Sequence, residues 1–334
     1  MADDESWYVN PGPVRVLSAI EMARLRPGMY VGDPSTVGLR HLVDWLLRDI
    51  VEWRPAPTRM IVTVEGDLLT IEDDRHVLPD PALLSAYAEQ NMPLVEHASA
   101  LHCRNAVVVG NALSREFVFE LWADGVGLRS NYARGQLQDG PRAFAPRSGH
   151  GCRVQLVADE TIFSSTTWNV GWLTERLRVL AGLTGVRVDL HNRNRGHTHE
   201  YSYPRGPASW IEQLAPTGVP RPALLASATA GELRCAVGWA WVKASGSRVL
   251  GYVDTHHTPY GTHTEGFRDA IGQLGRARGL HPFALVSVFL PEPRFESQVR
   301  RVLENEEVRP FVRDTVAAAL ERALEDPELR TLLL

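Results

Sequence analysis

Histidine and carboxylate side chains recur early in the chain in combinations that can move protons. His76 follows Asp73 and Asp74 at the end of a predicted strand, and His41 shares a predicted helix with Asp49. A histidine beside a carboxylate is a workable acid–base set near neutral pH, because the imidazole changes its charge in that range. These residues are therefore candidates for proton transfer.

A cysteine between a histidine and an arginine indicates a second chemistry. Cys103 stands between His102 and Arg104. A nearby cation lowers the pKa of a thiol and so raises the fraction of nucleophilic thiolate. Cys103 and His102 are therefore further catalytic candidates, although a lone cysteine is usually a small buried apolar group and a lone histidine an ordinary polar residue.

Paired histidines raise the question of a metal. His197 and His199 would share one face of a strand, and His256 and His257 are followed by His263. Zinc sites use at least three protein ligands, and no further ligand lies near these histidines in the sequence. We therefore expect them to be ordinary polar residues.

The composition is that of an ordinary globular protein, with 44% hydrophobic and 22% charged residues. A chain of 334 residues is long for one core, so two domains are expected. The net charge of -5 gives no overall basic surface for nucleic acid. The three cysteines are far apart, and the sequence has neither a secretory signal nor a run of about 18 apolar residues, so we expect a cytoplasmic protein.

The clearest element is an amphipathic helix from Gly38 to Trp53. Apolar residues recur at helical spacing on one side. Trp45, Asp49 and Glu52 share the other side, and charges on a helix usually face water, so a solvated face is the simplest prediction for it. The apolar stripe consists of Leu39, Leu42, Val43, Leu46, Leu47, Ile50 and Val51.

Strands and covering helices alternate along the rest of the chain, which indicates an α/β protein built of sandwich layers. The predicted helices are 16–25, 81–89, 167–183, 264–278 and 309–324. The predicted strands are 59–65, 68–72, 115–123, 128–134, 152–157, 186–190, 232–242, 247–253 and 283–290, and 106–113 fits either state. The expected organisation is an arm at 1–15, a first domain at 16–203, a proline-rich linker at 204–222 and a second domain at 223–334.

Several motifs, in order, resemble the ATPase region of gyrase B and its type II topoisomerase relatives. The matching segments are 26–33 (RPGMYVGD), 38–43 (GLRHLV), 111–114 (NALS), 176–186 (RLRVLAGLTGV), 261–268 (GTHTEGFR) and 287–298 (SVFLPEPRFESQ). The resemblance implies a GHKL-type (Bergerat) ATPase domain followed by a transducer domain with a ribosomal-protein-like α/β fold. It also implies ATP and Mg²⁺ as cofactors and a homodimer, with Tyr8 near the place of the family's arm tyrosine.

Positions that carry the family's chemistry are altered in this sequence. Trp45 stands at the position of the glutamate that polarises water, and Asp49 at that of the Mg²⁺-binding asparagine; an aspartate can still ligate Mg²⁺. Asp73, the adenine-binding aspartate, is kept, but Val77 replaces a glycine that follows it. The lid glycines are absent from 100–105 (ALHCRN). The remaining nucleotide-site positions hold Cys152 for a threonine, the retained Gln298, and Arg300 for the transducer lysine.

These changes lead to three readings of the function. The first is a degenerate, stand-alone relative that has lost ATP hydrolysis and acts as a dimerising pseudo-ATPase, binding a ligand or a partner such as gyrase subunits. The second is an enzyme that uses the former nucleotide cleft for acid–base or cysteine chemistry on a small molecule. The third is a residual ATP-binding, topoisomerase-related protein. The family's DNA-cleaving parts would lie beyond this region, so we expect neither topoisomerase activity nor direct DNA binding.

The second reading depends on polar residues that the resemblance gathers in the former cleft. They are His41, Asp49, Glu52, Asp73, Asp74, His76, His102, Cys103, Arg104, Cys152 and Arg300.

Overall fold

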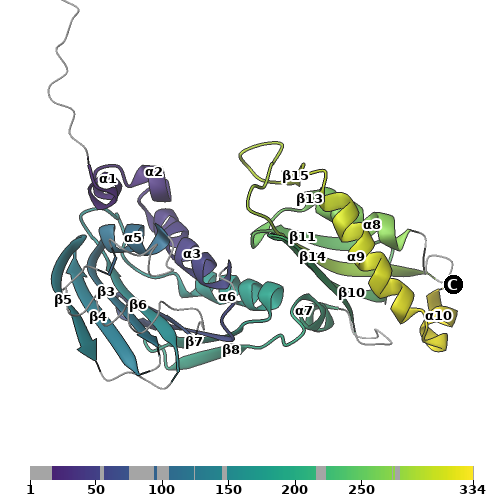
Figure 1. Cartoon of the computed structure of the whole chain (residues 1–334), viewed down its shortest axis with the longest axis horizontal. Helices are drawn as coiled ribbons and strands as arrows, with labels where there is room; N and C mark the ends of the chain where they lie inside the picture. The colour runs from purple at the N-terminus through teal and green to yellow at the C-terminus, as the bar shows by residue number, and fades with distance from the viewer. Residues whose placement is uncertain are drawn as a thin grey trace, which may run out of the picture.

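The computed structural model describes residues 17–52, 56–74, 94–95, 105–123, 125–144, 149–215, 223–272, 274 and 279–333. They form two large β-sheets with separate sets of helices, and the helix α7 (Pro207–Leu214) lies between these sheets (Figure 1). The predicted α/β fold is therefore confirmed.

The first part of the chain is built on an eight-stranded sheet with the order β5-β4-β3-β6-β2-β1-β7-β8. Its one parallel pair joins β1 to β7, and the other neighbours are antiparallel. The strands are β1 (Arg59–Glu65), β2 (Leu68–Asp73), β3 (Ser114–Ala123), β4 (Val126–Ala133), β5 (Gln136–Phe144), β6 (Gly151–Ala158), β7 (Arg187–Asn192) and β8 (His197–Tyr201).

Helices cover one face of this sheet, and the longest is α3 (Thr36–Glu52). All seven residues of the predicted apolar stripe on α3 are buried in the main core, which confirms that part of the prediction. The other helices of this part are α1 (Ala19–Leu25), α2 (Gly28–Val31), α5 (Asn105–Ala112) and α6 (Val170–Thr184). Asn169 caps α6 by accepting a hydrogen bond from the backbone N–H of Trp172.

The second part is built on a five-stranded sheet with the order β12-β11-β14-β10-β9. Helices cover its outer face and close a second core (Figure 1). The strands are β9 (Leu224–Ala230), β10 (Leu233–Lys243), β11 (Arg248–Val253), β12 (His256–His257) and β14 (Leu280–Phe289). The helices are α8 (Thr262–Ile271), α9 (Val308–Ala323) and α10 (Pro327–Leu333), and β13 (Tyr260–Gly261) pairs with β15 (Val302–Leu303).

Helix α7 joins the two parts through very close contacts. A Cβ atom on Gly182 of α6 would lie 2.4 Å from the ring of Trp210, and one on Gly238 of β10 would lie 2.3 Å from the Pro207 backbone. Only glycine allows α7 to approach both elements so closely. Trp210 and Ile211 then share the main core with Leu285 of the second sheet.

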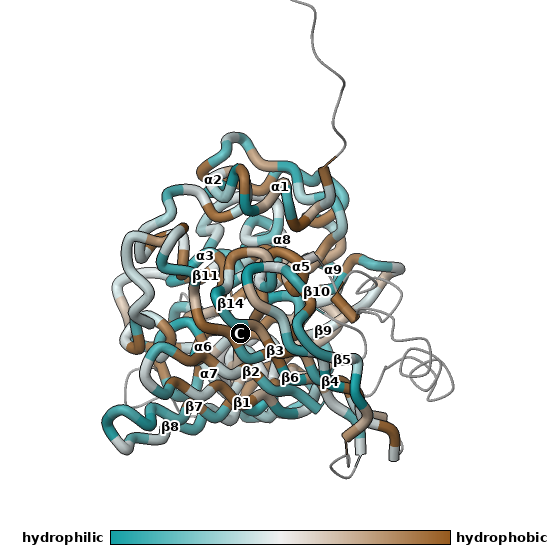
Figure 2. Tube along the Cα trace, turned by 90° about the vertical axis from the view of Figure 1, so that its left-hand side faces the viewer, coloured by the Kyte–Doolittle hydropathy of each residue, from teal (hydrophilic) through white to brown (hydrophobic). Residues whose placement is uncertain are grey.

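Several predicted boundaries were wrong. The edge strands β5 and β8 were not predicted, and β8 is almost entirely hydrophilic (Figure 2). The expected linker contains α7, and β9, α2 and α10 were not predicted. Edge strands and short polar elements lack the apolar alternation by which a strand is recognised. The ambiguous segment 106–113 is the helix α5, while the predicted helix 81–89 lies outside the described residues.

Within the described part of the chain, none of the helices is both long and apolar enough to cross a membrane.

Candidate functional site

The polar side of α3 is covered by protein, so the prediction of a solvated face was wrong. Arg176 of α6 binds the Asp44 carboxylate through its Nε. The same guanidinium donates to the Thr255 carbonyl at 2.9 Å and to the Thr255 hydroxyl at 2.8 Å. One arginine thus connects two helices of the first part to the turn between β11 and β12.

Asp49 lies inside this covered face. It is 8% exposed, and its Oδ2 accepts a hydrogen bond of 3.3 Å from the backbone N–H of Ala106, in the first turn of α5. A carboxylate at a helix N-terminus is stabilised by the unpaired N–H groups there. Trp45 is partly buried and packs against the main core. The two residues therefore help to hold α3 in place.

Asp73 and Cys152 lie opposite each other on the neighbouring strands β2 and β6. Both are 3% exposed. Asp74, directly after β2, accepts hydrogen bonds from the backbone N–H groups of Thr58 and Arg59 at 2.8 and 2.9 Å. Asp74 thereby fixes the chain entering β1. Asp73 and Cys152 are buried register partners where the central strands β2 and β6 meet.

His41 lies apart from these carboxylates. Its ring is exposed, and its Nδ1 is 2.8 Å from the Val31 carbonyl oxygen, so it donates to that carbonyl and ties α3 to α2. Gly32 lies against the same ring, since a Cβ on Gly32 would be 3.7 Å from it. The described contacts of His41 are therefore structural.

Arg300 meets the C-terminal end of α3. It lines a cleft together with Arg48, Glu52 and Asp254, and Arg48 donates to Glu52 at 3.1 Å. Burial is the main cause that raises the pKa of the Asp254 carboxyl to about 6. The nearby Glu52 adds to this rise, while the Leu290 N–H, Arg48 and Arg300 oppose it. The two parts of the protein therefore share one charged junction.

His256 belongs to the same junction. Burial lowers the pKa of its imidazole to about 4, and the positive charges of Arg48, Arg176 and Arg300 act in the same direction, against Asp44. Its Nε2 is buried without a hydrogen-bond partner among the described residues. Near neutral pH the ring is therefore uncharged.

The structure thus divides the predicted site. Asp49, Asp73 and Cys152 are buried, and Glu52 and Arg300 line the cleft between the two parts of the protein. Gln298 is exposed on the loop after β14. His76, Val77, His102, Cys103, Arg104 and Tyr8 lie outside the described residues.

Sequence reasoning missed Arg176, Asp254 and His256 as parts of the junction. Arg176 stood inside a matched motif, and His256 was considered only as a metal ligand. The described residues contain no group of three or more His, Cys, Asp or Glu side chains suited to a metal. His197 and His199 are exposed on β8.

Comparisons with known proteins find similarity to the B subunits of DNA gyrase and of a type 2 topoisomerase. A family model described as DNA gyrase B matches residues 280–333. The chain is 29% identical to DNA gyrase B of Thermus thermophilus, over 94% of this chain and 56% of the relative. It is 26% identical to the type 2 topoisomerase B protein of Aquifex aeolicus, over 93% of this chain and 46% of the relative. The chain therefore spans about half the length of the curated relatives it matches.

Solved structures extend the similarity to the fold. The 43K ATPase domain of Thermus thermophilus gyrase B, in complex with an aminocoumarin, superposes with a TM-score of 0.78 at 28% identity, covering 94% of this chain and 92% of that one. Gyrase B from Myxococcus xanthus superposes with a TM-score of 0.76 at 24% identity, covering 92% of this chain and 96% of that one. The chain thus resembles, in sequence over nearly all its length and in its GHKL-type fold, the N-terminal ATPase region of DNA gyrase B.

Proposed function

We propose that this protein is a gyrase B-like pseudo-ATPase, which binds a partner or ligand and does not hydrolyse ATP by the mechanism of its relatives. The observation that carries the proposal is Trp45 at the position of the general base. An indole has no basic nitrogen that could take a proton from water. Loss of a general base alone typically lowers a rate by about 10²–10⁴-fold.

The surroundings of α3 support this proposal. Mg²⁺ prefers several freely placed oxygen ligands in octahedral geometry. Asp49, the candidate ligand, already accepts a backbone N–H from α5, and Asp44 is bound by Arg176. The residues present therefore do not fit Mg²⁺-ATP as the family binds it. The polar side of α3 instead contributes to the contact between the two parts of the protein.

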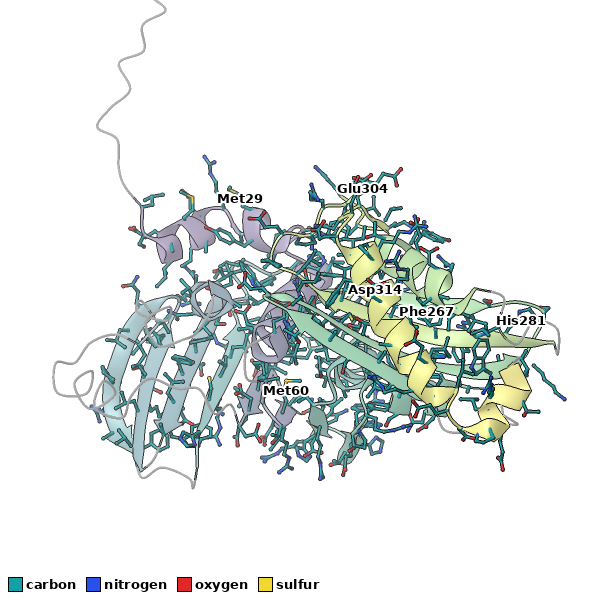
Figure 3. All side chains as sticks on the ribbon, turned by 45° about the vertical axis from the view of Figure 1, so that its right-hand side comes forward. Met29, Met60, Phe267, His281, Glu304 and Asp314 are labelled. Atoms are coloured by element: carbon teal, nitrogen blue, oxygen red, sulfur yellow. The ribbon has the colours of Figure 1, made fainter. Side chains whose placement is uncertain are left out.

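A binding role is supported by exposed apolar side chains on α1, α2 and the start of α3. Leu25 and Met29 are 65% and 71% exposed, and Met29 projects from α2 (Figure 3). Val37 at the start of α3 adds a third exposed apolar side chain. Exposed apolar side chains close together favour association with another protein. The relatives are named as subunits, which makes a second copy and gyrase subunits the first partners to test.

Sedimentation and thermal unfolding test this proposal together. We expect a dimer that does not require nucleotide, and a melting temperature that ATP with Mg²⁺ leaves unchanged, because a ligand that binds only the folded state would raise it. The variant M29E should weaken the dimer without changing the fold. A monomer in the absence of ATP that becomes a dimer with it would contradict the proposal.

A further inference from the structure

A cleft of about 1250 Å³ lies between the two parts of the protein, away from the buried pair Asp73 and Cys152. The ends of α3 and α6 form one wall, through residues such as Arg48 and Thr184. Strands β9 and β10 and the segment after β14 form the rest. Among the described residues, its lining contains neither Asp49 nor Asp73, and Arg300 is the one former nucleotide-site position that it includes.

The floor of the cleft is the part of the second sheet that α7 leaves uncovered. Cys235 and Val237 of β10 face the second core with α8 and α9. Successive side chains of a strand point to opposite faces, so Arg234 and Ala236 face the cleft. Arg234 pairs across the sheet with Phe289 on one side and with Thr229 on the other. Thr229 and Ala236, which line the cleft beside Arg234, have small side chains, so the Arg234 guanidinium is accessible from the cleft.

Two arginines in this cleft are held by aromatic rings. The Cζ of Arg234 lies 4.6 Å from the centre of the Phe289 ring, and the Cζ of Arg300 lies 5.6 Å from that of Phe295. No carboxylate of the described residues is within ion-pair distance of either guanidinium. Stacking fixes the plane of a guanidinium and leaves its N–H edge available for an oxyanion.

The carboxylates that line the cleft have partners other than Arg234 and Arg300, or lie at its rim. Glu52 is bound by Arg48, and its side chain is 13% exposed. Asp254 accepts the Leu290 N–H at 3.1 Å. Glu232 is exposed at the rim, in the turn between β9 and β10. None of the three forms an ion pair with Arg234 or Arg300, so both positive charges remain for a ligand.

We propose that this cleft binds a small polyanion, a phosphorylated or polycarboxylate molecule, through Arg234 and Arg300. A guanidinium recognises phosphate and carboxylate groups alike with paired, charge-assisted hydrogen bonds. Both binding arginines belong to the second part, and Arg48 of the first part lines the same cleft, so a bound anion lies beside both parts. Because the site lies away from Asp49 and Asp73, its test is independent of whether ATP is hydrolysed.

Calorimetric titration of the full chain with tripolyphosphate and with citrate, at constant ionic strength, tests this site and distinguishes the two chemical sources. We expect one of the two probes to bind, and R234Q and R300Q each to weaken that binding about tenfold or more, since a hydrogen bond to a charged group is lost. R294Q removes an exposed arginine from the same loop as Arg300, outside the cleft, and should bind within about twofold of the wild type.

The variant R234Q is the decisive test. Arg300 also stands at the position of the family's transducer lysine, so R300Q alone does not separate this site from the former nucleotide site. If neither probe binds at millimolar concentration, or if R234Q binds like the wild type, the proposed site is wrong. Circular dichroism of each variant shows whether it is folded. If R234Q does not fold, the exposed residue Arg300 takes its place, and wild-type binding by R300Q overturns the proposal.

Discussion

Arg176 and Thr255 connect the two parts of this protein, because the Arg176 guanidinium donates to both the carbonyl and the hydroxyl of Thr255 while it also binds Asp44. The Arg176 side chain is 12% exposed and that of Asp44 is 17% exposed. Thr255 itself has a positive φ of 67°, which is unfavourable for a β-branched residue. The arginine therefore holds a strained turn against two helices.

We expect R176Q to lower the free energy of unfolding by about 2–4 kcal/mol, because it leaves the half-buried Asp44 without its partner. The second part should then unfold in a separate, earlier transition. R178Q is the matched control, since Arg178 pairs with Glu175 on the exposed side of the same helix. The control should change stability by less than about 1 kcal/mol. Chemical denaturation with two probes measures both variants, and equal stabilities would exclude a role for Arg176 in joining the parts.

Asp254 and His256 should give opposite pH dependences. The raised pKa of Asp254, about 6, means that the folded state holds a proton more tightly than the unfolded chain, so its contribution to stability falls as pH rises from about 4 to about 6. The lowered pKa of His256, about 4, means that its contribution is lost as pH falls from 6.5 to about 4. In the wild type the two contributions largely offset each other.

Single variants should uncover these opposite contributions. D254N should lose about 1–3 kcal/mol of stability on acidification from pH 7 to pH 4 relative to the wild type, since about two pKa units correspond to that range. H256Q should gain stability relative to the wild type over the same interval. Thermal unfolding across this range measures both, and parallel curves for the three proteins would refute the assignment.

Asp159 should stabilise the attachment of α1. It is fully buried and accepts hydrogen bonds from Arg24 at 2.8 Å, from Arg134 at 3.2 Å and from the Thr161 hydroxyl at 2.7 Å. These bonds outweigh the effect of burial and lower its pKa to about 2. Its contribution is therefore complete above about pH 4 and is lost as pH falls towards 2.

D159N should accordingly lower the free energy of unfolding at pH 7 by about 2–4 kcal/mol, because two arginines lose their buried partner. The neighbour Glu160 also binds Arg134, but its side chain is 49% exposed, so E160Q serves as the control. We expect a change below about 1 kcal/mol for E160Q. A loss of the same size in both variants would show that Asp159 has no special role.

The sequence predicted the fold well where the apolar pattern was regular. The stripe of α3, the strands β1 and β2 and the helix α6 were all found from spacing. Edge strands such as β8 were missed because their side chains are polar on both faces. The local pattern of apolar and polar residues does not show which side chains a tertiary contact will bury.

The candidate site shows the same limit. Motif positions singled out Asp49 and Asp73, which the structure shows as buried carboxylates. The covering of α3 did not follow, since Arg176 and Thr255 are distant in sequence from Asp44 and only the fold brings them together. A charged helical face is therefore typical of a solvent-exposed surface, but tertiary partners distant in sequence can still cover it.

The release of inorganic phosphate from ATP, measured with the purified wild type in the presence of Mg²⁺, tests the central claim most directly. With Trp45 at the base position and Asp49 bound to α5, we predict no steady release above a protein-free blank. Steady ATP turnover by the wild type that is abolished in D49N or in R300Q would contradict the account.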